Sequence, residues 1–138
     1  MQIKEIMTSN VEISSPGTTL AEAAREMKAR DIGFLPVGYK DRLVGMVTDR
    51  DIVVRGLANG HDPQIATLQD IMTGQVLYLY DDQTIEEAAE SFARNAVRRM
   101  AVVDRDKRLA GIVTLGDLAA HGMRAEAGDA LEVISGAA

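Results

Sequence analysis

The feature that most constrains this chain of 138 residues is an internal repeat with a period of about 65 residues. The two copies share three segments, with one residue inserted before the last: 6–8 with 71–73, 22–24 with 87–89, and 45–51 with 111–117. A repeat of this length exceeds a typical solenoid unit and suits two copies of a small α/β unit. Because each copy alone would bury only a marginal core, we expect the two copies to pack together.

Each copy has the same predicted order of elements: a helical turn, a short strand, a capped helix, two strands and a second helix. The capped helices begin at Thr19-x-x-Glu22 and Thr84-x-x-Glu87, whose side chains satisfy free backbone N–H groups. The predicted strands are 11–14, 34–37 and 43–47 in the first copy, and 76–80, 100–103 and 109–113 in the second. The sequence therefore predicts an α/β fold of the α+β type, in which each unit is a small three-stranded sheet packed on two helices.

The repeat also suggests a division of the chain. We assign 1–60 to the first domain, 61–66 to a linker, 67–121 to the second domain and 122–138 to a C-terminal extension. Gly, Asp and Pro residues mark the region of the linker. Within the extension, 130–134 is expected to form a short helix.

Composition excludes several classes of function. The chain has no cysteine and two histidines, which argues against a disulfide scaffold, thiol catalysis and a metal site. A net charge of −6 argues against nucleic-acid binding by bulk charge. No apolar run approaches the roughly 20 residues that span a bilayer, and no apolar signal opens the chain, so we expect no membrane association and a cytoplasmic location. Without a nucleophile, a histidine triad or a phosphate loop, we expect no enzyme activity.

The two copies resemble a pair of CBS domains, the small sensor unit named after cystathionine beta-synthase; such a pair is called a Bateman module. The resemblance covers about residues 1–121 and rests on the opening Ile-Met-Thr, the capped Ala-rich helix and the strand Leu35-Pro36-Val37. Its most specific part is Gly-x-x-Thr-x-x-Asp, which occurs at 45–51 and again at 111–117. The resemblance implies tandem units related by a pseudo-twofold axis, with two clefts between the copies.

The resemblance also implies a nucleotide site. In family members that bind adenosine nucleotides, the Asp of this pattern accepts hydrogen bonds from the ribose, and the Thr and the residue before the Asp lie near ribose and phosphate. The matching positions are Thr48, Arg50 and Asp51 in the first copy and Thr114, Gly116 and Asp117 in the second. Elementary chemistry agrees, because Thr and Asp three residues apart at a helix start can face one side, where the helix N-terminus favours phosphate. An ionised Asp accepts hydrogen bonds from a diol.

A pair of arginines distinguishes the second copy. Arg98 and Arg99 precede a strand at positions that carry phosphate-binding cations in the family, whereas the first copy has Gly33 and Phe34 there. Guanidinium groups form forked hydrogen bonds with phosphate, so we expect unequal clefts and one dominant site. Because strand neighbours face opposite sides, we expect one arginine, either of the two, to point into a cleft, unless a splayed strand end lets both reach it. The sequence leaves open which aspartate shares a cleft with the arginines.

Structural interpretations compete with these assignments. Each Thr-Asp pair has the residue types of a simple N-cap, and the arginines suit a solvated face. Ala101 replaces the proline found at Pro36, and Gly116 offers phosphate only its N–H.

Two hypotheses therefore stand. In the first, the chain is a stand-alone sensor that binds AMP, ADP or ATP, requires no other cofactor, and acts through homodimerisation or on a protein partner in trans. In the second, it is a ligand-independent interaction or assembly module.

Overall fold

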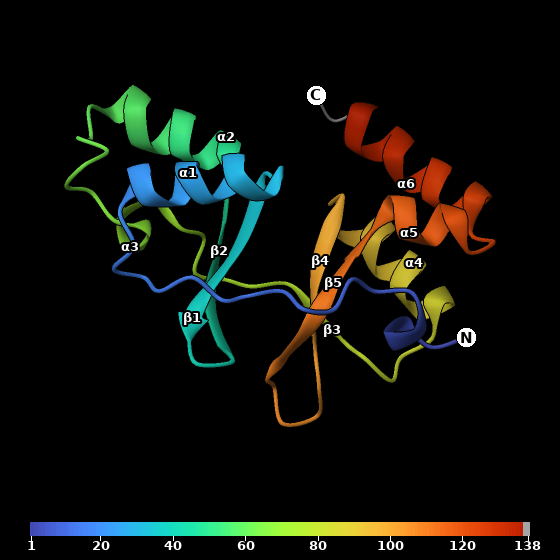
Figure 1. The fold of residues 1–138 in the computed structure, drawn as a ribbon. Helices are drawn as coiled ribbons and strands as arrows, with labels where there is room; N and C mark the ends of the chain where they lie inside the picture. The colour runs from blue at the N-terminus through green and yellow to red at the C-terminus, as the bar shows by residue number, and fades with distance from the viewer. Residues whose placement is uncertain (137–138) are drawn as a thin grey trace. The chain divides into compact units, whose positions relative to one another are not determined.

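The computed structural model describes residues 1–136, which form two compact units (Figure 1). The first unit spans Glu12–Val76, and the second unit joins Met1–Val11 to Leu77–Ala138. These units do not coincide with the two copies of the repeat. Each unit takes its opening segment, with the Ile-Met-Thr triplet, from the other copy.

The first unit contains one antiparallel strand pair and several helical segments. Its strands β1 (Phe34–Tyr39) and β2 (Arg42–Thr48) pair with Phe34 opposite Thr48. The elements are α1 (Leu20–Arg30), β1 (Phe34–Tyr39), β2 (Arg42–Thr48), α2 (Asp49–Asp51), a π-helical turn η2 (Ile52–Gly56), a 3-10 turn η3 (Leu57–Asn59) and α3 (Leu68–Ile71).

The second unit contains a three-stranded sheet of order β3-β4-β5, in which β3 runs parallel and β5 antiparallel to β4. The elements are η1 (Ile3–Glu5), β3 (Tyr78–Tyr80), α4 (Ile85–Asn95), β4 (Arg99–Val103), β5 (Leu109–Thr114), α5 (Leu115–Ala120) and α6 (Arg124–Gly136). The predicted class of mixed helices and sheets is confirmed. No helix within residues 1–136 is long and apolar enough to cross a bilayer.

The helices α1 and α4 begin where the capping motifs predict. Thr19 Oγ1 and Thr84 Oγ1 each accept a hydrogen bond of 3.1 Å from the backbone N–H of the glutamate three residues later. At α4 the box is reciprocal, because the Thr84 N–H donates to Glu87 at 3.4 Å. Among the described residues, only the threonine half of the box forms at α1, so the predicted box is half right there.

The predicted strand at 11–14 is reduced to a single bridge between Ser14 and Val37. The Ser14 N–H donates to the carbonyl oxygen of Pro36 at 2.9 Å. A longer parallel ladder would require the N–H of Pro36 on one side and of Pro16 on the other. Proline has no N–H, so pairing ends after one residue in both directions.

The second unit has donors at both of these positions, Asp81 and Ala101. The Asp81 N–H donates to the carbonyl oxygen of Val103 at 2.9 Å, and β3 pairs with β4 over three residues. Replacement of proline by Ala101 therefore accompanies a longer sheet.

Two glycines allow the opening segments to approach the sheets. A methyl group on Gly45 would lie 2.6 Å from the sulfur of Met72, and one on Gly111 would lie 2.5 Å from the carbonyl oxygen of Thr8. The opening segments also pair with the strands, because Thr8 and Ile112 exchange backbone hydrogen bonds of 2.8 and 2.9 Å. The repeated glycine and the repeated Ile-Met-Thr are therefore two halves of one contact, made once in each unit.

The C-terminal helix is longer than expected. The sequence predicts a helix at 130–134, whereas α6 spans Arg124–Gly136. It packs against α4 and α5, as Figure 1 shows, and buries Ala127 and Ala130. The small side chains allow this close packing, and they give little sequence signal for a helix of this length.

Candidate functional site

The candidate residues lie at two junctions where a strand runs into a helix, one in each unit. We call these the first junction, between β2 and α2, and the second junction, between β5 and α5. The first junction holds Thr48, Arg50 and Asp51; the second holds Arg98, Arg99, Thr114, Gly116 and Asp117.

Both junctions form the same reciprocal cap. Thr48 Oγ1 accepts from the Asp51 N–H at 3.1 Å, and Asp51 Oδ2 accepts from the Thr48 N–H at 2.9 Å. Thr114 and Asp117 make the same two bonds at 3.1 and 2.9 Å. The capping interpretation is thus confirmed, but a carboxylate accepts about four hydrogen bonds, so capping leaves capacity for a ligand.

The aspartate of the first junction has an internal cation partner. Arg55 Nε lies 3.8 Å from Asp51 Oδ1, and Arg55 Nη1 donates to Thr73 Oγ1 at 3.1 Å. Arg55 therefore links the cap to the segment contributed by the second copy. Arg55 was not predicted as a site residue, although an Asp and an Arg four residues apart on a helix are typical of an ion pair.

The aspartate of the second junction has a different environment. His121 stands where the first copy has Arg55, and its Nδ1 lies 2.8 Å from the backbone oxygen of Asp117. Within residues 1–136, the Asp117 carboxylate takes part in no ion pair. Its free oxygen is therefore not committed to an internal cation.

A second acidic side chain crowds the first junction. The Asp49 N–H donates to the carbonyl oxygen of Gly33 at 3.0 Å. A methyl group on Gly33 would lie 2.7 Å from Asp49 Oδ2, so the carboxylate occupies the space beside this glycine. The exposed Arg50 adds a positive charge, and its backbone N–H donates to Asp49 Oδ1 at 2.8 Å.

The second junction has arginine where the first has glycine. The Leu115 N–H donates to the carbonyl oxygen of Arg98 at 3.0 Å, and Arg99 lies opposite Thr114 in the ladder. Arg98, which precedes β4, is exposed, and Arg99, the first residue of β4, is half-buried. The backbones of both arginines therefore lie beside the start of α5, at the junction that contains Asp117.

Gly116 lies in the first turn of α5. A methyl group there would lie 3.5 Å from Thr114 Oγ1, an ordinary contact distance. The position therefore tolerates a side chain sterically, and Gly116 contributes only its backbone.

Comparison with known proteins identifies the repeat. A family model described as CBS domain matches residues 3–57 and 68–123. The CBS domain-containing protein YhcV of Bacillus subtilis is 40% identical over 134 residues, which cover 96% of this chain and 94% of that protein.

Solved structures support the same relationship. The crystal structure of Hypoxic Response Protein I with two coordinated zinc ions, a protein known from Mycobacterium tuberculosis, has a TM-score of 0.79 at 40% identity. The superposition covers 88% of this chain and 98% of the chain of Hypoxic Response Protein I. CBSX2 in complex with AMP has a TM-score of 0.75 at 26% identity, covering 91% and 98%.

The family model describes a domain and not a catalytic activity. Among residues 1–136, no three His, Asp or Glu side chains gather closely enough to hold a metal ion.

Proposed function

The chain belongs to the CBS domain family as a tandem pair, and from that premise we propose that it is a stand-alone sensor of an adenine nucleotide, AMP, ADP or ATP. Tandem CBS proteins serve in general as regulatory nucleotide-sensing modules, and CBSX2 was solved with AMP. The sensor would work without enzyme activity and without another cofactor, in the cytoplasm, through homodimerisation or on a protein partner in trans.

The observation that carries the proposal is the second junction. Asp117 keeps a carboxylate oxygen that is outside its cap, and the exposed Arg98 supplies a cation in the same unit. An ionised carboxylate suits the two hydroxyl donors of a ribose, and a guanidinium suits phosphate. The junction thus offers one group for each half of a nucleotide.

The first junction is the weaker candidate. Asp51 is paired with Arg55, and the Asp49 carboxylate lies beside Gly33 where the second copy carries an arginine. The added negative charge opposes phosphate binding. We therefore propose one dominant nucleotide site, which uses Arg98, Arg99, Thr114, Gly116 and Asp117, and a weaker or empty site at Thr48, Arg50 and Asp51.

A ligand-independent assembly module is the second candidate. The observation in its favour is the link from Asp51 through Arg55 to Thr73, because these groups satisfy one another without a ligand. In this interpretation both junctions serve only to start helices.

Calorimetry with AMP, ADP and ATP separates the two candidates. A hydrogen bond to a charged group contributes about 1.5–3 kcal/mol, so Asp117→Ala should weaken binding about ten- to hundred-fold. Asp51→Ala is the matched control, and it should leave the dominant site nearly unchanged. Arg98→Ala or Arg99→Ala should reduce the preference for ATP over adenosine.

Binding by the wild type that neither single variant nor the double variant weakens would contradict the ribose assignment. Absence of binding by all three nucleotides would favour the assembly module.

A further inference from the structure

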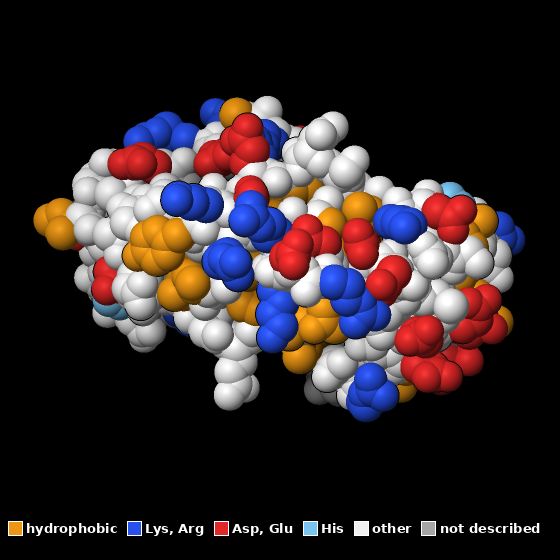
Figure 2. Space-filling model, turned by 90° about the horizontal axis from the view of Figure 1, so that it is seen from below, with side chains coloured by type: hydrophobic (Ala, Val, Ile, Leu, Met, Phe, Trp, Pro, Cys, Tyr) orange, Lys and Arg blue, Asp and Glu red, His pale blue; other side chains and the backbone are white. Residues whose placement is uncertain are grey.

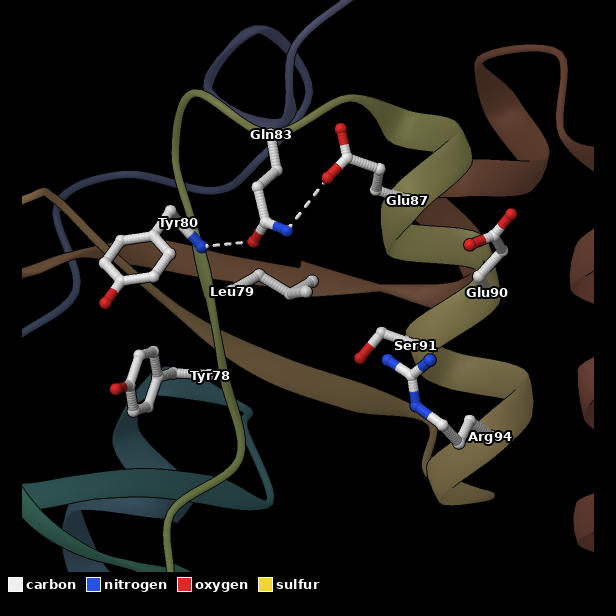
Figure 3. Close-up of a pocket in the computed structure, with 8 residues that line it drawn as sticks. All are labelled: Tyr78, Leu79, Tyr80, Gln83, Glu87, Glu90, Ser91 and Arg94. Atoms are coloured by element: carbon white, nitrogen blue, oxygen red, sulfur yellow. Dashed lines mark hydrogen bonds between the residues drawn. The ribbon is translucent and has the colours of Figure 1, made fainter.

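The second unit contains a hollow that is separate from the junction residues. It lies between β3 and α4 and has a volume of about 300 Å³. Figure 3 shows its lining residues, which are Tyr78, Leu79, Tyr80, Gln83, Glu87, Glu90, Ser91 and Arg94. The volume is at the lower end of the range for small-molecule sites. No residue assigned to the nucleotide site lines it.

The polar groups on α4 are ordered by charge along the helix. Glu87 lies toward its N-terminal end, Glu90 and Ser91 follow about one turn later, and Arg94 lies one turn beyond them (Figure 3). A helix rises about 1.5 Å per residue, so the backbones of Glu87 and Arg94 are about 10 Å apart along its axis. The hollow therefore has Glu87 at its acidic end and Arg94 at its basic end, about two turns apart, with Glu90 and Ser91 between them.

The acidic end is held in place. Glu87 accepts a hydrogen bond of 3.1 Å from Gln83 Nε2, and Gln83 Oε1 accepts from the Tyr80 N–H at 2.8 Å. The hydrogen bonds from Gln83 and Thr84 hold the pKa of Glu87 below its usual value. Glu87 is therefore a preorganised anion near neutral pH.

Near the basic end, the buried hydroxyl of Ser91 donates to a weak hydrogen-bond acceptor. Ser91 is 6% exposed, and its hydroxyl donates to the thioether sulfur of Met100 at 3.6 Å. Sulfur is a weak acceptor, so a ligand oxygen would be a better partner for this hydroxyl. In Figure 3 the Ser91 hydroxyl and the Arg94 guanidinium both extend from α4 toward β3.

An apolar wall and the net charge of the lining determine which kind of ligand fits the hollow. Leu79 points from β3 toward α4 and supplies an apolar wall (Figure 3). Within residues 1–136, Glu90 and Arg94 take part in no ion pair. Two carboxylates and one guanidinium give the lining a net charge of −1, which disfavours nucleotides and other polyanions.

The first copy does not repeat this chemistry. At the positions of Tyr78 and Tyr80 it has Ile13 and Ser15, and at the position of Arg94 it has Ala29. It also has Arg25 at the position of Glu90. The order of charges along the helix is therefore peculiar to α4.

We propose that the hollow binds a small basic amino acid, with its carboxylate on Arg94 and Ser91, its amines on Glu87 and Glu90, and its apolar stem over Leu79. A ligand such as lysine has net charge +1, which complements the lining. Its carboxylate and α-amine share one carbon and would meet Arg94, Ser91 and Glu90, while its ε-amine would reach Glu87 from the other end of a flexible chain. The site extends the proposed function with a second class of signal, and it does not depend on nucleotide binding.

The test is a titration of the full chain followed by amide resonances in NMR. The probes are L-lysine, 1,5-diaminopentane, which lacks the carboxylate, and hexanoate, which lacks the amines. Lysine should shift resonances in 78–94 and bind at least about tenfold more tightly than either analogue, because each analogue loses at least one charged contact. Equal affinity for lysine and 1,5-diaminopentane, or lysine shifts that exclude 78–94, would overturn the proposal.

Variants locate the two ends of the ligand. Arg94→Gln should remove the advantage of lysine over 1,5-diaminopentane, and Arg94→Lys should restore part of it. Glu90→Gln should weaken lysine and 1,5-diaminopentane alike. The matched control is Arg25→Gln on α1, which should leave lysine binding unchanged.

Nucleotide calorimetry on Arg94→Gln distinguishes this proposal from the nucleotide site. Unchanged nucleotide binding together with lost lysine selectivity supports two separate sites. Unchanged lysine selectivity in a folded Arg94→Gln overturns the assignment of the carboxylate, whatever the outcome with nucleotides.

Discussion

The two units share their caps and strand pairs but differ in how their helices are covered. In the second unit α6 packs on α4 and α5, and Met123, directly before α6, is 9% exposed. Leu57 holds the equivalent position in the first unit and is 51% exposed, with Val53 and Val54 exposed beside it. The charged surface and the apolar patches between the charges are visible in Figure 2. The repeated sequence pattern thus gives both units the same caps and strand pairs. The additional helix α6 buries the helix surfaces of the second unit that remain exposed in the first.

The sheets differ for a simpler reason. Pro16 and Pro36 limit the first unit to one parallel bridge, whereas Asp81 and Ala101 allow three paired residues in the second. Two missing N–H groups therefore explain the difference in strand number between units with otherwise similar sequences.

The largest expected effect tests the exchange of opening segments. Ile3 is fully buried in the second unit, and its counterpart Leu68 is fully buried in the first. Truncation of either to alanine should cost about 2–5 kcal/mol of unfolding free energy in urea. Hydrogen exchange should show that Ile3→Ala loosens 77–136 and Leu68→Ala loosens 12–66.

The control for this pair is Ile65→Ala, at a side chain that is 75% exposed, which should change stability by less than about 0.5 kcal/mol. Loosening of 12–66 alone by Ile3→Ala would contradict the division into units.

The next effect compares the two glycine contacts. Gly111→Ala would place a methyl 2.5 Å from a backbone oxygen, whereas Gly45→Ala would meet the flexible Met72 sulfur at 2.6 Å and a backbone oxygen at 2.9 Å. Overpacking costs about 1–3 kcal/mol, and Gly111→Ala should lie nearer the upper end because backbone cannot move aside. Thermal and urea unfolding measure the difference. Gly74→Ala, with open space around it, is the control, and equal stability of all three variants would refute the contact.

A smaller effect tests the role of proline in the sheets. Ala101→Pro should shorten β3 at the Tyr78 end, because position 101 would lose its N–H, while the Asp81 N–H would still pair with Val103. The cost should be about 0.5–1.5 kcal/mol, the net contribution of one hydrogen bond. Pro36→Ala should instead allow a longer ladder in the first unit. Amide exchange in 76–80 and 11–14 reports both changes, and unaltered protection in both variants would contradict the explanation.

The smallest effect is a pH dependence found in the second unit. Arg105 donates to both carboxylate oxygens of Asp82, at 2.9 and 2.7 Å, and holds the pKa of Asp82 below its usual value. A lowered pKa in the folded state gives stability that is complete above the ordinary pKa and is lost as pH falls through the lowered one. In a plot of the urea unfolding midpoint against pH, the midpoint of the wild type should fall at acid pH. Asp82→Asn should make this fall slightly less steep.

The first unit has Gly17 and Lys40 at the positions of this pair, so Lys40→Gln should leave the fall at acid pH unchanged. An identical fall for the wild type and Asp82→Asn would show that the exposed pair contributes nothing measurable.

Much of the fold could be predicted from the sequence because its signals are local. The caps at Thr19, Thr84, Thr48 and Thr114 and the two antiparallel strand pairs depend on residues close together along the chain. The length of α6 escaped prediction because small residues give a weak periodic signal. The single bridge at Ser14 escaped it because its cause lies in two prolines on separate segments.

Some residues of the candidate site could likewise be predicted from the sequence, and others could not. The Thr-Asp pairs and the arginines could be named from spacing, and their role in nucleotide binding stays a prediction. Arg55, Asp49 and the hollow beside α4 were missed, since each depends on side chains brought together by folding.

The sequence by itself determined the repeat, the helix starts, the family and the unequal distribution of arginines, because these depend on residue types at fixed spacing. Only the tertiary structure decided which copy supplies each opening segment, which aspartate is paired with a cation, and which helices are covered. The physical reason is that caps satisfy backbone groups within one turn, whereas burial and charge pairing depend on segments that are distant in the chain.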